Sequence, residues 1–212
     1  MHCDDADEFL DSSSYNHTPT VIGGAQTTPS PSVFSVAGKF DGAGDGVKYP
    51  SHAAFQFGTG DFAIDLRFRT NTTSGTHVLF DFRDGTNPGP YLRQNGRHLI
   101  YSDGLTDRIG FFDFLQSNTW YHIVILRKSG VTQMFIDGVR VGDRFPDSSN
   151  YTCGSFIFFA IDKDGSSNSI NGYLDEVRVS KGTDRGWGNS GFTPPAAGFS
   201  AGLARAQALI MG

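Results

Sequence analysis

The chain has 212 residues and a net charge of −5, and its length fits one all-β domain. Its Lys and Arg residues are scattered without a run or stripe, which excludes the cationic surface expected of a protein that binds nucleic acid. No apolar stretch approaches the ~20 residues needed to cross a bilayer, so we expect no membrane insertion, and the polar start MHCDDADEF is unlike a secretory signal. The two cysteines, Cys3 and Cys153, are too few for a disulfide scaffold and lack the spacing of a zinc site.

Three short strands are predicted in the first quarter of the chain, at Thr20–Ile22, Gly38–Asp41 and Val47–Tyr49. The segment GGAQTTPSPS between the first two is rich in Gly, Pro and Ser and lacks periodicity, so we expect a surface loop there. In the following segment DFAIDLRFR, apolar residues occupy every second position from Phe62 to Phe68. This alternation predicts a strand with one buried face and one wet face.

Further strands are predicted at residues 76–82, 91–94 and 97–102, followed by the segment WYHIVILRK at 120–128. That segment has apolar residues on both faces, which is typical of a central strand covered on both sides. Its His122 is in phase with Trp120 and Val124 and is interpreted as a buried residue. The next segment, VTQMFIDGVRVG, predicts a hairpin, because Asp137-Gly138 favours the positive φ angles of a two-residue type I′ turn.

The last strands are predicted at residues 155–161 and 172–180, and the whole series predicts an antiparallel β-sandwich of two sheets. The residues expected to contribute to its core are Phe62, Ile64, Leu66, Phe68, Val124, Leu126 and Phe158. The closing segment AGLARAQALIMG predicts a short helix with a stripe of Leu203, Ala206, Leu209 and Ile210. A helix this short has marginal stability in water by itself. We therefore expect that it docks on the sandwich, packs against a partner chain or stays frayed.

Three stretches together resemble a known family: FDGAGDGVKYP with FGTGDFAIDLRFRT, then NTWYHIVILRKSGVTQMFIDGVRVG, then NGYLDEVRVSKG. They are similar to the concanavalin A-like lectin/glucanase superfamily in its laminin G-like form, which implies a jelly-roll sandwich over residues 1–199 followed by a helical tail at 200–212. The opening HCDDADEFLDSSSYNHTPTV and the closing LDEVRVSKGTDRGWGNSGFTPPAAGF resemble laminin G-like modules of bacteriophage virion proteins. In the opening, Cys3 replaces the usual Phe and Asp5 the usual Gly.

Catalysis is not expected, although many members of this superfamily hydrolyse glycosides with an acid and a nucleophile about 5 Å apart. Of the 22 acidic residues, the two Glu are Glu8 and Glu176, so no Glu-x-Asp-x-Glu array exists in the chain. No segment gives Asp residues the alternate spacing that points a pair into one groove. The sequence therefore predicts a non-enzymatic protein.

The resemblance also implies one structural calcium ion that joins the first strand, the loop after Phe-Asp-Gly and the Leu-Asp-Glu-Val strand. On this chain the ligands are Asp4, Asp41, Asp45 and Asp175. Calcium takes oxygen ligands of this kind, but the same Asp residues are also common as turn residues and hydrogen-bond acceptors. In the loop GWGNSG, Trp187 either stacks on a sugar or packs over a sheet edge.

Two functional hypotheses follow from the resemblance. In the first, the chain is a structural virion module, a capsid decoration, fibre or tail-associated protein, made in the host cytoplasm and attached to other virion proteins or to its own copies. In the second, it is a carbohydrate-binding, lectin-like domain, virion-borne or secreted, with a cell-surface glycan as ligand. The scarcity of cysteine fits a reducing compartment of synthesis. The fold alone decides neither, because one sandwich hosts many functions.

Overall fold

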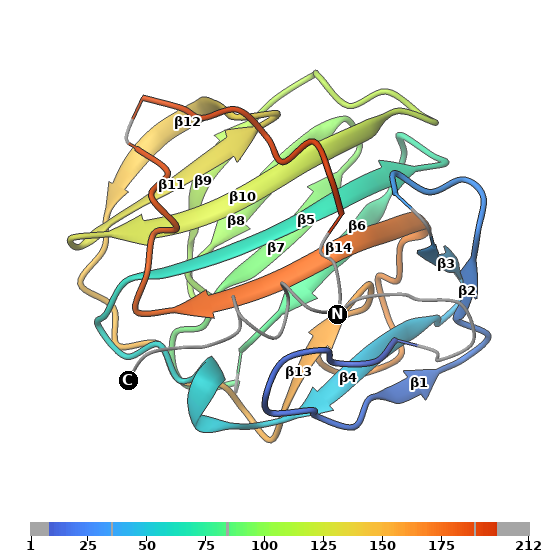
Figure 1. Cartoon of the computed structure of the whole chain (residues 1–212), viewed down its shortest axis with the longest axis horizontal. Helices are drawn as coiled ribbons and strands as arrows, with labels where there is room; N and C mark the ends of the chain where they lie inside the picture. The colour runs from blue at the N-terminus through green and yellow to red at the C-terminus, as the bar shows by residue number, and fades with distance from the viewer. Residues whose placement is uncertain (1–8, 35, 84, 189, 199–212) are drawn as a thin grey trace.

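The computed structural model describes residues 9–34, 36–83, 85–188 and 190–198, which form two antiparallel sheets packed face to face (Figure 1). Each sheet has seven strands, which confirms the predicted all-β sandwich. The first sheet has the order β1 (Thr20–Ile22), β4 (Gly46–Pro50), β13 (Phe156–Phe159), β6 (Thr76–Asp81), β7 (Tyr91–Asn95), β8 (His98–Ser102) and β9 (Asp107–Phe111). The second has the order β12 (Val139–Pro146), β11 (Val131–Ile136), β10 (Trp120–Lys128), β5 (Phe62–Thr70), β14 (Asn171–Lys181), β3 (Ala37–Asp41) and β2 (Gln26–Thr28).

The main core lies between the sheets, and the alternation read from β5 explains how that strand contributes to it. Phe62, Ile64, Leu66 and Phe68 are at most 1% exposed and belong to one cluster with side chains of the first sheet. The partners in that cluster from the first sheet include Val47, Leu79, Phe80, Leu92, Leu99, Tyr101, Ile157 and Phe159. Because neighbouring residues of a strand face opposite ways, the residues between those four on β5 point away from the core.

Three of the expected core positions are buried outside the main core. Val124 and Leu126 are fully buried, but they belong to a second cluster with Ala63 and Phe135, on the outer face of the second sheet. Their neighbours on β10 fill the space between the sheets instead. Phe158 is buried on the outer side of the first sheet, because the residues on either side of it are the ones in the main core. A strand with apolar residues on both faces does not reveal which face meets the other sheet.

The predicted hairpin is confirmed, since Asp137 and Gly138 both have positive φ, 49° and 79°. Two edge strands were missed. β2 lies inside the segment expected to be a loop, and β9 has no clear alternation. The helix predicted at the C-terminal end, and the boundary at residue 199, lie outside the described residues and stay predictions. No helix in the described part of the chain has the length and apolar character needed to cross a membrane.

Candidate functional site

The outer face of the second sheet carries a line of aromatic and polar side chains that runs across five strands. The strand register aligns Trp120 of β10, Arg69 of β5 and Tyr173 of β14. Lys39 of β3 and Gln26 of β2 continue the line. The neighbours of these residues along each strand are buried or lie at the strand ends, so the five side chains point away from the core. We call these five residues the open row.

The open row is accessible and internally ordered. Lys39 and Gln26 are exposed and the other three members are half-buried. The Trp120 and Tyr173 ring centroids lie 6.3 Å apart, and the guanidinium carbon of Arg69 lies 5.2 Å from the Tyr173 ring centroid. Arg69 Nη1 donates a hydrogen bond to Asn71 Oδ1 at 3.2 Å. The row therefore presents two aromatic rings with a guanidinium held beside them.

The next two rows on the same face are mostly polar, and their residues are buried or half-buried. His122, Arg67 and Asp175 align in one row, and Val124, Asp65 and Arg178 in the following one. Between these rows β14 has a bulge, in which residues 176 and 177 stand opposite a single residue of β5, and Glu176 has a φ of 50°. The bulge turns Glu176 toward the outer face, beside Asp175.

A C-terminal segment, residues 183–188 and 190–198, covers these buried rows, and we call it the strap. In Figure 1 it is the red coil that crosses the face of the second sheet in front of β10 and β11. Trp187 and Phe192 stack with ring centroids 4.4 Å apart and 12° between their planes. Both pack on the cluster formed by Val124, Leu126 and Phe135. The strap therefore explains why β10 has apolar residues on both faces, because it covers the outer face of that strand.

The hairpin turn between β11 and β12 anchors the strap. The Phe192 N–H donates to the Gly138 carbonyl oxygen at 2.9 Å. A Cβ added to Gly138 would lie 1.9 Å from the Phe192 carbonyl oxygen, and the φ of 79° also disfavours a side chain there. Gly138, which the turn favours for its positive φ, therefore also lets the strap pack closely against the hairpin, because it has no side chain.

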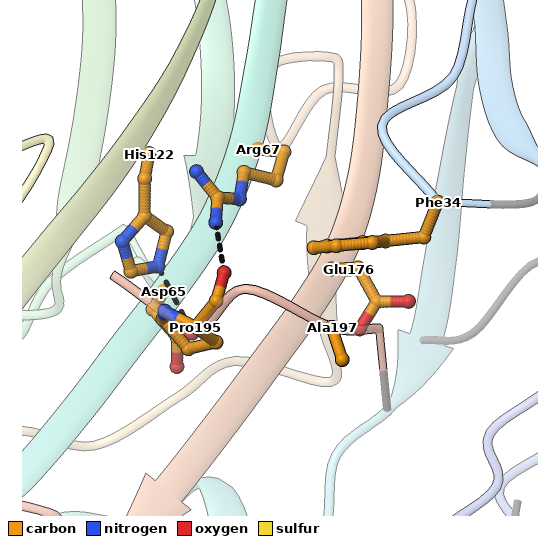
Figure 2. A pocket seen from close by; sticks show the side chains of 7 residues that line it. All are labelled: Phe34, Asp65, Arg67, His122, Glu176, Pro195 and Ala197. Carbon is orange, nitrogen blue, oxygen red and sulfur yellow. Dashed lines mark hydrogen bonds and ion pairs between the residues drawn. The ribbon is translucent and has the colours of Figure 1, made fainter. Parts of the chain in front are cut away.

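A small pocket with a cavity volume of about 10 Å³, close to the room that one water molecule needs, remains where the strap meets the sheet (Figure 2). It is lined by Phe34, Asp65, Arg67, His122, Glu176, Pro195 and Ala197. Arg67 Nη2 donates to the Pro195 carbonyl oxygen at 2.8 Å, which closes one side. Burial lowers the pKa of Arg67, although nearby carboxylates, Asp137 foremost, oppose that shift. Ligand pockets usually measure about 300–1,000 Å³, so this one is small for a ligand.

Asp65 is the centre of the buried polar network. Arg178 donates to both of its oxygens, each at 2.9 Å, and His122 Nε2 lies 3.4 Å from Oδ1 (Figure 2). Burial by itself would raise the pKa of Asp65, but the Arg178 charge and the hydrogen bonds from His122 and Arg178 outweigh it and lower the pKa. The carboxylate is therefore held ionised. His122 Nδ1 is buried and finds no hydrogen-bond partner among the described residues.

The carboxylates of this face correct one step of the sequence reasoning. No pair on a common face was expected, yet Asp65 and Asp175 share the outer face through the pairing of β5 with β14, and the bulge adds Glu176 to that face. An acid for glycoside cleavage needs a raised pKa, and Asp65 has a lowered one. Asp175 Oδ2 accepts the Val33 N–H at 2.8 Å. The arrangement suits holding the strap and neighbouring loop in place more than proton transfer.

Trp187, the residue considered for sugar binding, packs over the sheet. It is 9% exposed, with one ring face against Phe192 and the charged groups of Arg178 and Arg185 each 5.6 Å from its ring centroid. Its indole therefore has no open face for a sugar in this arrangement. Of the two alternatives stated for this residue, packing is the one observed.

The predicted calcium ligands are not gathered by the structure. Asp4 lies outside the described residues. Asp41 pairs with Asn171, four residues before Asp175 on β14, so the two Asp lie about 13 Å apart along the sheet at ~3.3 Å per residue. A calcium ion bonds oxygens at about 2.3–2.6 Å and could not reach both. Among the described residues, no group of three or more His, Cys, Asp or Glu side chains is placed to hold a metal ion.

The carboxylate oxygens of Asp45 and Asp175 accept hydrogen bonds from main-chain N–H groups. Asp45 is buried, and its two oxygens accept the Gly24 N–H at 2.5 Å and the Asp41 N–H at 3.0 Å. Asp175 holds Val33 as described above, so both carboxylates act as acceptors for main-chain N–H groups. The residues present do not fit one shared ion, and calcium binding by this protein stays a prediction.

The open row was not predicted from the sequence. Trp120, Arg69 and Tyr173 lie on correctly predicted strands, but alternation marks only Arg69 as a surface residue, because β10 has apolar residues on both faces and the bulge interrupts the alternation of β14. Their alignment depends on which strands pair and in what register, and these strands are far apart in the sequence. An aromatic residue at an outward position of a strand is the feature that could have marked the row.

Comparison with family models gives one match, a laminin G-like model described as "Concanavalin A-like lectin/glucanases superfamily", over residues 41–183. Three members of the open row, Arg69, Trp120 and Tyr173, lie inside the matched range, and Lys39 and Gln26 precede it. No curated protein sequence matches the chain.

Solved structures with the same fold include binding domains of botulinum neurotoxins. The binding domain of botulinum neurotoxin DC in complex with rat synaptotagmin II matches with a TM-score of 0.63 and 15% identity, over 92% of this chain and 47% of that one. A structure reported for botulinum neurotoxin type C, whose cell entry depends on two ganglioside molecules, matches with a TM-score of 0.63 and 14% identity, over 82% and 46%. The chain therefore spans about half the length of these proteins, and at this identity the likeness shows the fold alone.

Proposed function

The chain belongs to the concanavalin A-like lectin/glucanase superfamily, and from this we propose that it is a non-catalytic carbohydrate-binding domain whose glycan site is the open row. The observation that carries the proposal is the alignment of Trp120, Arg69 and Tyr173 on an accessible sheet face. Aromatic rings supply large apolar contact surfaces, while polar groups beside them supply hydrogen bonds. A sugar presents both kinds of surface, an apolar ring face and a rim of hydroxyl groups.

The groups around the rings suit hydroxyl recognition. Arg69 and Lys39 are donors, and Gln26 is both donor and acceptor. Asn71 and Asn171 lie at the rim of the row, where Asn71 Nδ2 donates to Asn171 Oδ1 at 3.0 Å. The row is thus polar at its edges and aromatic at its centre, as binding surfaces for amphipathic ligands commonly are.

A second line of support comes from the buried rows. The carboxylates nearest the open row are engaged, with Asp65 paired to Arg178 and Asp175 bonded to the Val33 N–H. The strap also covers them, which leaves little room for a substrate to reach them. These features favour binding without hydrolysis.

The neighbouring structures support the proposal at the level of fold. One of them was solved as a binding domain in complex with SialylT, with a TM-score of 0.61 and 14% identity over 92% of this chain and 47% of that one. This sandwich is therefore a fold that binding domains use. The ligand proposed for the present chain depends on its own residues.

The test is binding of the intact chain to a panel of immobilised glycans, followed by titration of the best ligand. Because Trp187 is buried, a ligand-induced change in tryptophan fluorescence is expected to come from Trp120. Trp120→Ala should weaken binding about tenfold or more, in the range found when an aromatic contact residue is removed from a binding site. Phe112→Ala is the matched control, because Phe112 is 63% exposed and follows β9 of the other sheet. Equal affinity of the Trp120 and Phe112 variants would place the glycan elsewhere.

A virion is the proposed setting of this activity, either as a capsid decoration or on a fibre or tail. The support is the resemblance of the opening and closing segments to phage virion modules, together with the scarcity of cysteine. Mass spectrometry of purified particles would test it, since a virion component is found in the particles in fixed proportion to the capsid protein. A secreted lectin would instead be found free in the medium.

A further inference from the structure

The charged members of the open row are both cations. Arg69 and Lys39 lie on β5 and β3 with Tyr173 between them in register. Neither forms an ion pair with a carboxylate of the described residues, whereas Arg93 and Arg178 pair with Asp107 and Asp65. In a chain with a net charge of −5, this places unneutralised positive charge beside two aromatic rings.

The acids closest along these strands do not cancel that charge. Asp175 and Glu176 lie on the same face next to the row, and both are buried at the bulge of β14. Asp41 is exposed at the end of β3, where its Oδ1 accepts the Ala43 N–H at 2.7 Å. The row therefore has two accessible cations against one accessible acid that is already bonded to its own loop.

Arg69 is positioned to hold an anion. A guanidinium has five N–H donors in one plane, and among the described residues Arg69 uses one hydrogen bond, to Asn71. Its contact with the Tyr173 ring limits the rotamers that the side chain can adopt. A planar guanidinium binds carboxylate and sulfate groups through paired hydrogen bonds, and pre-positioning reduces the entropy lost on binding.

We propose that the open row binds an acidic sugar, with its ring on Trp120 and Tyr173 and its carboxylate or sulfate on Arg69 and Lys39. This inference rests on the proposed glycan site and names the ligand class of that same site. A free inorganic anion would lack the ring contact, and a neutral sugar would leave the cations unused.

The experiment compares polymers that differ only in charge. Polygalacturonate is matched with its methyl-esterified form, and dextran sulfate with dextran, so the two pairs separate carboxylate from sulfate recognition. The wild-type chain should bind at least one charged polymer about tenfold more tightly than its neutral partner, the effect expected of a charge-assisted hydrogen bond. Added salt should weaken that preference, because the row is accessible to counterions.

Variants identify the residues responsible. Arg69→Gln and Lys39→Gln should each reduce the preference for the charged polymer and leave binding to its neutral partner within about twofold, whereas Trp120→Ala should weaken both. Lys39 is exposed, so its variant tests the charge with little risk to folding. Equal affinity for charged and neutral partners would overturn the acidic preference and leave the glycan site standing. Binding to none of the four polymers would overturn the acidic-sugar proposal, whereas the glycan site itself is decided by the glycan panel and the Trp120→Ala variant.

Discussion

Removing the Trp187 side chain tests whether the strap is part of the folded core. Trp187 is 9% exposed, so Trp187→Ala removes about 200 Å² of buried aromatic surface, worth about 5 kcal/mol as an upper limit at ~25 cal/mol per Å². Truncation of a buried Trp typically costs about 3–5 kcal/mol. Because the strap can move away from the sheet and relieve part of the cavity, we expect a loss of about 3 kcal/mol in the free energy of unfolding.

The assay is urea unfolding followed by far-ultraviolet circular dichroism, together with limited trypsin digestion at Arg185 in the strap. The variant should unfold at lower urea and be cut at Arg185 sooner than the wild type. Phe112→Ala, at a side chain 63% exposed, should change stability by less than about 0.5 kcal/mol. A loss below about 1 kcal/mol for Trp187→Ala, with unchanged digestion, would show that the strap does not contribute to the core as described.

Two further predictions concern the carboxylates of the same face. Asp65→Asn should cost about 3 kcal/mol at neutral pH, because it breaks the buried ion pair between Asp65 and Arg178. The pKa of Asp65 is lower in the folded protein, so its ionised form stabilises the fold above the unfolded pKa, and this stabilisation is lost as pH falls through the folded pKa. On acidification below about pH 4 the Asp65→Asn variant should therefore lose less stability than the wild type. Thermal melts at a series of pH values measure the difference. Asp175→Asn should lower the melting temperature equally in calcium and in chelator, because its effect arises from the Val33 hydrogen bond. A loss seen in calcium alone would instead identify Asp175 as a calcium ligand.

Several features of the fold follow from local sequence. The alternation from Phe62 to Phe68 predicted the buried face of β5, since side chains of a strand point alternately to opposite faces. Asp137-Gly138 predicted the hairpin, since both residues tolerate positive φ. The apolar residues on both faces of β10 predicted a strand covered on both sides. Each of these conclusions depends on residues that are neighbours in the chain.

The features that make the candidate site depend on contacts between distant segments. Local pattern showed that β10 is covered, but only the tertiary structure identified the cover as the strap and placed Trp187 beneath Phe192. The bulge at Glu176 reverses the parity of β14 and brings Glu176 onto the outer face beside Asp175, which alternation cannot anticipate. The open row exists because strands from five parts of the chain pair in one register, and that register is set by the packing of the whole sandwich.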